Sequence, residues 1–135
     1  MMKNEKSQLA LEFVMLLGFL ILIMGVVIMF SFEANRGVIE DNIQSKMEDF
    51  TYSLQSEILL AAEMNEGYVR QINVPATVEN TYYNISVISS KNSSLLYVNY
   101  TGKVINAKLP KVYGTLTKGN NYLRNINGEV FINTT

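Results

Sequence analysis

The sequence predicts an α+β protein in which one long N-terminal helix precedes a small antiparallel β domain that packs on the helix's second half. Three observations predict this fold. An uncharged apolar run of 20 residues extends from Phe13 to Phe32. Apolar residues then recur at steps of three or four as far as Ala62, a spacing typical of an amphipathic helix. Beyond Gly67 the chain consists of short runs rich in Val, Ile and Tyr, separated by Gly, Pro, Asn and Ser, which is typical of strands and turns.

The apolar run is long enough to cross a membrane as a helix. At about 1.5 Å per residue its length approaches the ~30 Å thickness of the hydrocarbon layer. Because lipid offers no partners to backbone polar groups, the run must be helical there. Lys3 and Lys6 precede the run, whereas Glu33, Glu40 and Asp41 follow it. This asymmetry favours an N-terminus inside the cell and a following domain outside.

The amphipathic half should bury one stripe of side chains against the β domain. We expect the helix to run from about residue 9 to residue 65 and to end near Asn65–Gly67, where glycine suits a C-cap. The stripe consists of Ile39, Ile43, Met47, Phe50, Leu54, Ile58, Ala61 and Ala62.

Strands are expected at residues 68–74, 82–88, 94–101, 112–117 and 129–132, with a possible further strand near 104–109. The dipeptide Asn127-Gly128 predicts a tight turn before the last strand. Alternation gives the faces of two of these strands. The side chains expected in the core are Tyr83, Ile85, Val87, Leu96, Val98 and Tyr100, and those expected in solvent are Asn84, Ser86, Asn99 and Thr101.

Composition argues against an enzyme. The chain has 135 residues with no cysteine and no histidine, so it lacks thiol chemistry, the usual proton shuttle and the commonest metal ligands. We expect no catalytic residue, no metal site and no cofactor. The acidic pairs Glu40-Asp41 and Glu48-Asp49 indicate a solvated helix face rather than a calcium site.

Charge is distributed unevenly along the chain. Residues 1–66 contain ten acidic and four basic residues, whereas residues 67–135 contain two acidic and seven basic ones. The basic residues after Gly67 are scattered, so no nucleic-acid partner is expected. The two halves could attract each other within one chain or between copies, or they could simply be solvated surfaces.

A single carboxylate, Glu12, stands immediately before the apolar run. Burying an unpaired carboxylate in hydrocarbon costs several kcal/mol, so we expect Glu12 to have a partner. The stretch Gln8-Leu-Ala-Leu-Glu12-Phe-Val-Met-Leu16 resembles the Gln-x-Ser-x-Glu-x-x-x-Leu start of archaeal type IV pilins, with Ala10 in place of the serine. The resemblance covers these nine residues and a preceding leader of the class III signal-peptide type, which ends in Lys6-Ser7.

The resemblance implies a specific processing and assembly route. A membrane prepilin peptidase would cut the bond between Ser7 and Gln8, removing residues 1–7 and keeping residues 8–66 as the long helix and 67–135 as the head. Cleavage frees an α-amino group on Gln8, and Glu12 would neutralise this group on a neighbouring subunit. Two alternatives remain open, because Glu12 is also placed to pair with Gln8 of its own helix or to interact with the helix dipole.

Gly18 and Gly25 are seven residues apart and therefore lie on nearly the same side of the helix. Small residues let neighbouring helices approach closely. The other interpretation is that glycine is simply tolerated in membrane helices.

Four Asn-x-Ser/Thr sequons occur in the predicted β domain, at Asn84, Asn92, Asn99 and Asn133. Glycosylation of an exported protein is expected at the first three, whereas Asn133 is a weaker candidate because it lies close to the last residue of the sequence.

The resemblance leads us to expect a subunit of an extracellular type IV pilus-like filament used for adhesion or surface contact. Its partners would be copies of itself, the prepilin peptidase, the pilus assembly platform in the membrane, membrane lipid before assembly, and N-linked glycans. The alternatives are a bitopic, membrane-anchored surface binding protein, a minor pilin that does not form the bulk filament, and an archaellin.

Overall fold

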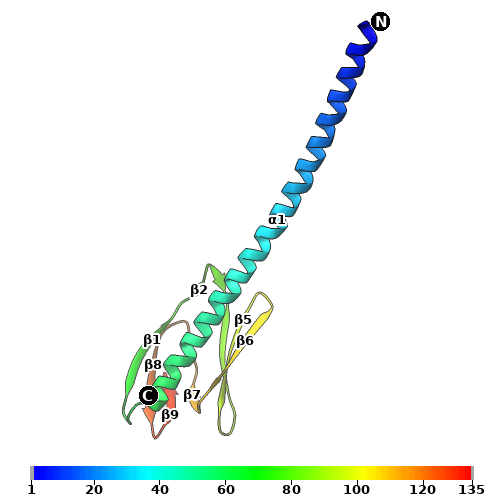
Figure 1. The fold of residues 1–135 in the computed structure, drawn as a ribbon. Coiled ribbons are helices and arrows are strands. Elements are labelled where there is room, and N and C mark those ends of the chain that lie inside the picture. The colour runs from blue at the N-terminus through cyan, green and yellow to red at the C-terminus, as the bar shows by residue number, and fades with distance from the viewer. Residues whose placement is uncertain (1, 135) are drawn as a thin grey trace. The chain divides into compact units, whose positions relative to one another are not determined.

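The structure, a computed structural model, describes residues 2–134, with side chains from residue 5 onward. The chain divides into two compact units, Met1–Asp41 and Asn42–Thr135. Helix α1 spans Met2–Glu63 and contributes to both units, and every strand belongs to the second unit (Figure 1). The predicted fold class, a long N-terminal helix followed by a small β domain rich in antiparallel pairs, is confirmed.

Nine strands form three sheets within the described residues. A four-stranded sheet has the order β1-β8-β9-β7, a three-stranded sheet has the order β4-β5-β6, and β2 pairs with β3. The strands are β1 (Val69–Val74), β2 (Thr77–Val78), β3 (Thr81–Tyr82), β4 (Asn84–Ser89), β5 (Ser94–Tyr100), β6 (Lys103–Leu109), β7 (Val112–Gly114), β8 (Gly119–Ile126) and β9 (Glu129–Ile132).

One strand pair departs from the expected antiparallel arrangement, because β7 and β9 are parallel. Strand β9 forms a hairpin with β8 and therefore runs opposite to it. Strand β7 does not pair with β8, its neighbour in sequence, but lies on the far side of β9.

Two strand predictions need correction. Strand β8 was missed because Gly119-Asn120-Asn121 reads as a turn, although the asparagines belong to the strand. The strand expected at residues 112–117 ends at Gly114, which has a φ of +95°. A Cβ at Gly114 would lie 2.0 Å from the carbonyl oxygen of Ile132, so only glycine allows β9 to pass this close.

Smaller differences separate the other predicted strands from the structure. The run expected at residues 82–88 divides into β3 and β4, with Tyr83 between them, and the two-residue strand β2 was not expected. The predicted turn at Asn127-Gly128 is confirmed. Both residues have positive φ, 55° and 79°, as a two-residue type I′ hairpin requires.

The two larger sheets are joined on one side by two serine side chains. The hydroxyl of Ser89 on β4 donates to the carbonyl of Val112 on β7 at 2.7 Å, and the amide of Val112 donates to the Ser94 hydroxyl at 3.0 Å. Ser94 is buried and donates to Ser89 at 3.1 Å. These bonds replace the backbone ladder that β4 and β7 do not form.

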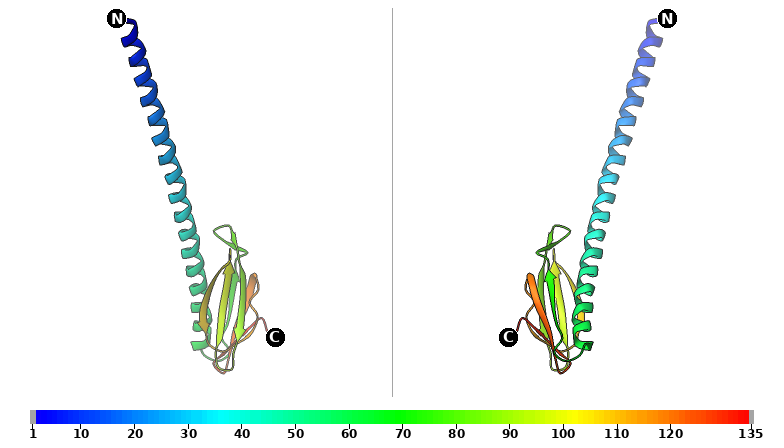
Figure 2. Two further views of the ribbon diagram at one scale, coloured as in Figure 1. Left: turned by 90° about the vertical axis from the view of Figure 1, so that its right-hand side faces the viewer. Right: turned by 90° about the vertical axis from the view of Figure 1, so that its left-hand side faces the viewer.

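Residues 42–63 of α1 occupy the opposite side, between the β1 and β6 edges. Gln55 donates from Nε2 to the carbonyl of Lys108 on β6 at 2.7 Å, and Arg70 on β1 donates to Glu57 at 2.9 Å. Gln55 and Glu57 point in opposite directions because two helical residues apart correspond to about 200°. The strands lie to one side of this helical segment (Figure 2).

The predicted helical stripe is confirmed from Ile43 onward, whereas Ile39 is exposed. The predicted faces of the two strands are also confirmed: Leu96, Val98 and Tyr100 are buried, and Asn84 and Asn99 are exposed. The buried core consists of Met47, Leu54, Ile58, Ala61, Ile72, Val74, Tyr83, Leu96, Val98, Tyr100, Ala107, Leu109, Val112, Leu116, Leu123, Val130 and Ile132.

Tyr83 is a buried tyrosine with a defined polar partner. Its ring makes an edge contact with Phe50 at 5.1 Å between centroids, and its hydroxyl donates to the carbonyl of Pro75. Burial raises the pKa of Tyr83 to about 12. Because the folded state favours the neutral phenol, this contribution to stability is complete below pH ~10 and is lost as the pH rises toward ~12.

The helix ends at Glu63 rather than near Asn65, and a distant side chain caps it. Nδ2 of the buried Asn125 on β8 approaches the carbonyl oxygens of Ala61, Ala62 and Met64 at 2.9, 3.0 and 2.8 Å. Its Oδ1 accepts from the amide of Gly128 at 2.9 Å. Gly67 does adopt positive φ, but it lies beyond the helical carbonyl oxygens that lack an intrahelical donor.

We predict that Asn125→Asp destabilises the second unit by about 2–4 kcal/mol, because a carboxylate removes the donor and places negative charge against carbonyls at a helix C-terminus. Urea unfolding of the full chain in detergent, followed by near-ultraviolet circular dichroism, measures the change. Asn106→Asp, at an exposed position of β6, is the matched control and should change stability by less than about 0.5 kcal/mol. Equal effects of the two variants would contradict the capping role.

Candidate functional site

The most distinctive surface of the described chain is the apolar segment of α1 from Phe13 to Phe32. All its large apolar side chains are exposed, from 45% for Ile23 to 72% for Met29. The exposed side chains therefore surround the helix rather than forming one stripe. Within the described residues, α1 is the one helix that is long and apolar enough to cross a membrane, with a mean hydropathy of 3.0 over its most apolar 18 residues. None of that window is buried in the described structure.

Gln8 and Glu12 lie at the start of this segment, both exposed. Together with Glu5 and Leu9 they line a shallow depression on one side of the helix. Among the described residues the only ion pair joins Arg70 and Glu57, so Glu12 has no basic partner within 4 Å there. No basic group in the described part of the chain therefore neutralises the charge of Glu12.

The predicted processing bond, between Ser7 and Gln8, lies inside α1. The helix begins at Met2, whereas we expected it to begin near residue 9. Residue 1 of the predicted leader, and the side chains of residues 2–4, fall outside the described residues.

Gly18 and Gly25 have no structural requirement within their own chain. A Cβ at either position would meet no atom within 4 Å, and neither residue adopts positive φ. The same is true of Gly37, which lies beyond the apolar segment. If glycine is required at positions 18 and 25, the requirement must therefore come from a neighbouring molecule in lipid or in an assembly. Otherwise glycine is simply tolerated there.

The four sequons differ in environment. Asn92 is exposed in the loop between β4 and β5. Asn84 and Asn99 are exposed and lie directly opposite each other on β4 and β5. Nδ2 of Asn133, the atom that a glycan would modify, instead approaches the carbonyl of Thr115 and Oδ1 of Asn121 at 3.1 and 2.8 Å.

Asn121 and Asn125 were not singled out from the sequence, because an asparagine-rich run gives no sign of burial. Both are buried on β8, on the same face as Leu123. Oδ1 of Asn121 accepts from the amide of Thr117 at 2.9 Å, and Nδ2 of Asn121 donates to the Thr117 carbonyl. These two side chains organise loops and the helix end, so their role is structural.

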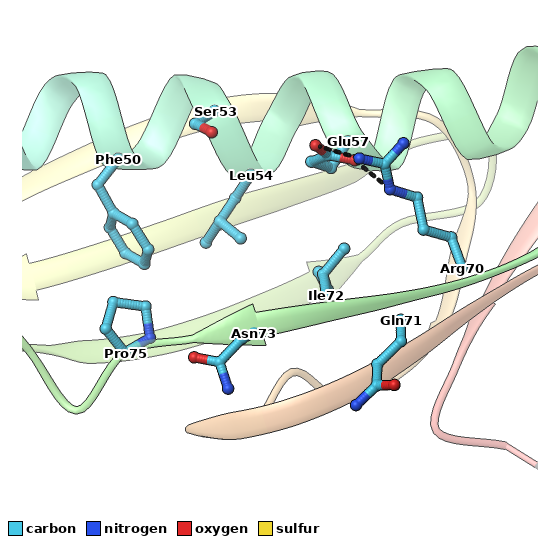
Figure 3. A pocket seen from close by; sticks show the side chains of 9 residues that line it. All are labelled: Phe50, Ser53, Leu54, Glu57, Arg70, Gln71, Ile72, Asn73 and Pro75. Atoms are coloured by element: carbon cyan, nitrogen blue, oxygen red, sulfur yellow. Dashed lines mark hydrogen bonds and ion pairs between the residues drawn. The ribbon is translucent and has the colours of Figure 1, made fainter.

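A groove of about 330 Å³ separates α1 from the edge strand β1 (Figure 3). Phe50 and Pro75 line one end of the groove, and the ion pair of Glu57 and Arg70 lies at the other. Nε of Arg70 is 2.8 Å from Oε2 of Glu57, with both side chains partly exposed. A hydrogen bond with Tyr68 and the charge of Glu57 raise the pKa of Arg70. A partly exposed pair of this kind contributes little to stability.

We predict that no chain carries glycans at Asn84 and at Asn99 at the same time. Opposite positions of an antiparallel pair hold Cβ atoms about 4.5–5.5 Å apart, so two attached sugars would collide. Asn133 should remain unmodified, whereas Asn92 is free to be modified independently. Intact-peptide mass spectrometry of the native protein measures occupancy, and Asn84→Gln should raise occupancy at Asn99. A substantial population with glycans at both positions would contradict the prediction.

Residues that could hold a metal ion are not gathered in the described part of the chain, where no group of three acidic side chains is close enough to do so. No family model, curated protein or solved structure matches this chain.

Proposed function

We propose that the chain is a structural subunit of an extracellular type IV pilus-like filament, assembled through residues 8 to about 32 of its long helix. The observation that carries the proposal is an apolar segment of 20 residues, exposed on every side and directly preceded by Glu12, a carboxylate that has no basic partner among the described residues. Such a segment needs both an apolar environment and a positive group.

In the proposed route, lipid surrounds the apolar segment first, and other copies of the segment surround it later. Burying one large apolar side chain is favourable by about 1.5–3 kcal/mol, so the 17 exposed ones between Phe13 and Phe32 represent tens of kcal/mol. Lipid supplies cover before assembly, with Lys6 on the inner side and the β domain outside. Copies of the same segment, packed into a helical bundle, supply cover in the filament.

The positive group would arise from processing. Cleavage between Ser7 and Gln8 removes Glu5 and creates an α-amino group beside Glu12. In a site with low dielectric constant, opposite charges attract strongly while either charge alone is costly. Pairing of Glu12 with Gln8 of a neighbouring copy would therefore fix the position at which each subunit enters the bundle.

We predict that Glu12→Gln still enters the membrane and is still cleaved, but forms at least tenfold less filament. The substitution keeps the size of the side chain and removes the charge that neutralises the amine of Gln8. Sheared surface filaments are quantified by immunoblot, and their first residue is identified by N-terminal peptide mass spectrometry.

Glu5→Gln is the matched control, because Glu5 lies on the same side of the helix but leaves with the leader. This variant should give the normal filament yield, with chains that begin at Gln8. Normal yield from Glu12→Gln would remove the assembly role of Glu12. Recovery of the wild-type chain only from membranes, with residues 1–7 retained, would favour the bitopic surface protein instead.

We also predict that Gly18→Leu and Gly25→Leu reduce assembly without reducing membrane insertion. Glycine at both positions meets open space in its own chain, so any cost must come from a neighbouring helix that approaches closely. Gly37→Leu is the control outside the apolar segment and should assemble normally. Normal filament yield from both apolar-segment variants would show that these glycines are only tolerated.

A further inference from the structure

A second groove, of about 260 Å³, lies on the outer surface of the β domain. The start of β4, the end of β5 and Lys118, in the segment between β7 and β8, form its walls. Asn84 and Asn99 lie side by side within it, as register partners. Grooves of this size suit a single small ring rather than a large ligand.

The polar groups that line the groove are rich in donors. Asn84 and Asn99 each contribute an amide, Thr101 a hydroxyl and Lys118 an ammonium group. No acidic side chain lines the groove. In the described part of the chain, these four side chains have no hydrogen bond or ion pair to another residue. In a chain without a glycan at Asn84 or Asn99, they are therefore available to a ligand that accepts hydrogen bonds.

Two tyrosine rings hold the ammonium group of Lys118 without neutralising it. Nζ of Lys118 lies 4.8 Å from the ring centroid of Tyr83 and 5.9 Å from that of Tyr82, within the range of a cation–π contact. The ring of Tyr82 is 78% exposed and offers an apolar platform beside the charge. Burial raises the pKa of Tyr100 in the groove wall, and so does the negative charge of Glu48 on α1, whose Oε1 accepts a hydrogen bond from Gln44.

An exposed aromatic face, two amides, a hydroxyl and an unpaired cation match one class of ligand. The apolar face of a sugar ring packs on aromatic side chains, its hydroxyls bind amides, and a carboxylate binds an ammonium group. A neutral sugar would leave Lys118 unused, and a bare inorganic anion would leave Tyr82 unused. We propose that this groove binds an acidic saccharide, a pyranose unit that carries a carboxylate.

An acidic saccharide would be the chemical target of the proposed surface contact. The biological role of this binding rests on the proposed function, whereas the binding itself does not. Binding is a property of the single β domain and does not require a filament. It can be measured on the unassembled chain, so failure to bind would leave the assembly proposal intact.

The test uses the full chain in detergent micelles, produced in a host without N-glycosylation so that Asn84 and Asn99 are unmodified. Isothermal titration calorimetry compares trigalacturonate with maltotriose, a neutral trisaccharide. Trigalacturonate should bind at least about tenfold more tightly, and its affinity should fall as salt rises. Lys118→Met, which keeps an unbranched stem without the charge, and Tyr82→Ser should each weaken trigalacturonate binding by about tenfold.

Lys91→Met is the matched control, because it removes an exposed lysine from the β4–β5 loop, outside the groove. This variant should bind like the wild type. Equal affinity for the two trisaccharides, no binding of trigalacturonate, or equal losses for Lys91→Met and Lys118→Met would each overturn the proposal.

Discussion

The rest of the molecule depends on an apolar helical surface that no described residue of the chain covers. The free energy of leaving this surface in water, tens of kcal/mol, exceeds the roughly 5–15 kcal/mol by which an ordinary domain is stable. No rearrangement of a β domain this small could compensate for it. We therefore propose that the segment is in lipid or against other apolar chains at every stage, and that the charge of Glu12 at its start selects these neighbours.

The second half of the same helix has a different task. Residues 42–63 fill the space between the β1 and β6 edges, where Glu57 contacts one strand and Gln55 the other. Ser89 and Ser94 close the opposite side. The β domain would expose its core without this helical segment, so we expect the segment to stay in the domain during the proposed transfer from lipid to filament.

Sequence periodicity was sufficient to predict the elements whose residues alternate in polarity. The helical stripe from Ile43 and the faces of β4 and β5 follow from spacing alone. Strand β8 did not, because its buried face includes Asn121 and Asn125, whose burial depends on carbonyls supplied by distant segments. The residues at the start of the apolar segment were predicted from a local motif. The groove at Lys118 was not, since it exists only where β4, β5 and a later loop meet.

The most direct test of the account is a helical reconstruction of filaments sheared from the cell surface, at a resolution that shows side chains. The account predicts that residues 13–32 of every copy lie at the filament axis, covered by neighbouring copies. It also predicts that the carboxylate of Glu12 lies within about 4 Å of the Gln8 amine of an adjacent copy. A filament in which this segment faces solvent, or in which Glu12 has no cationic partner, would contradict the account.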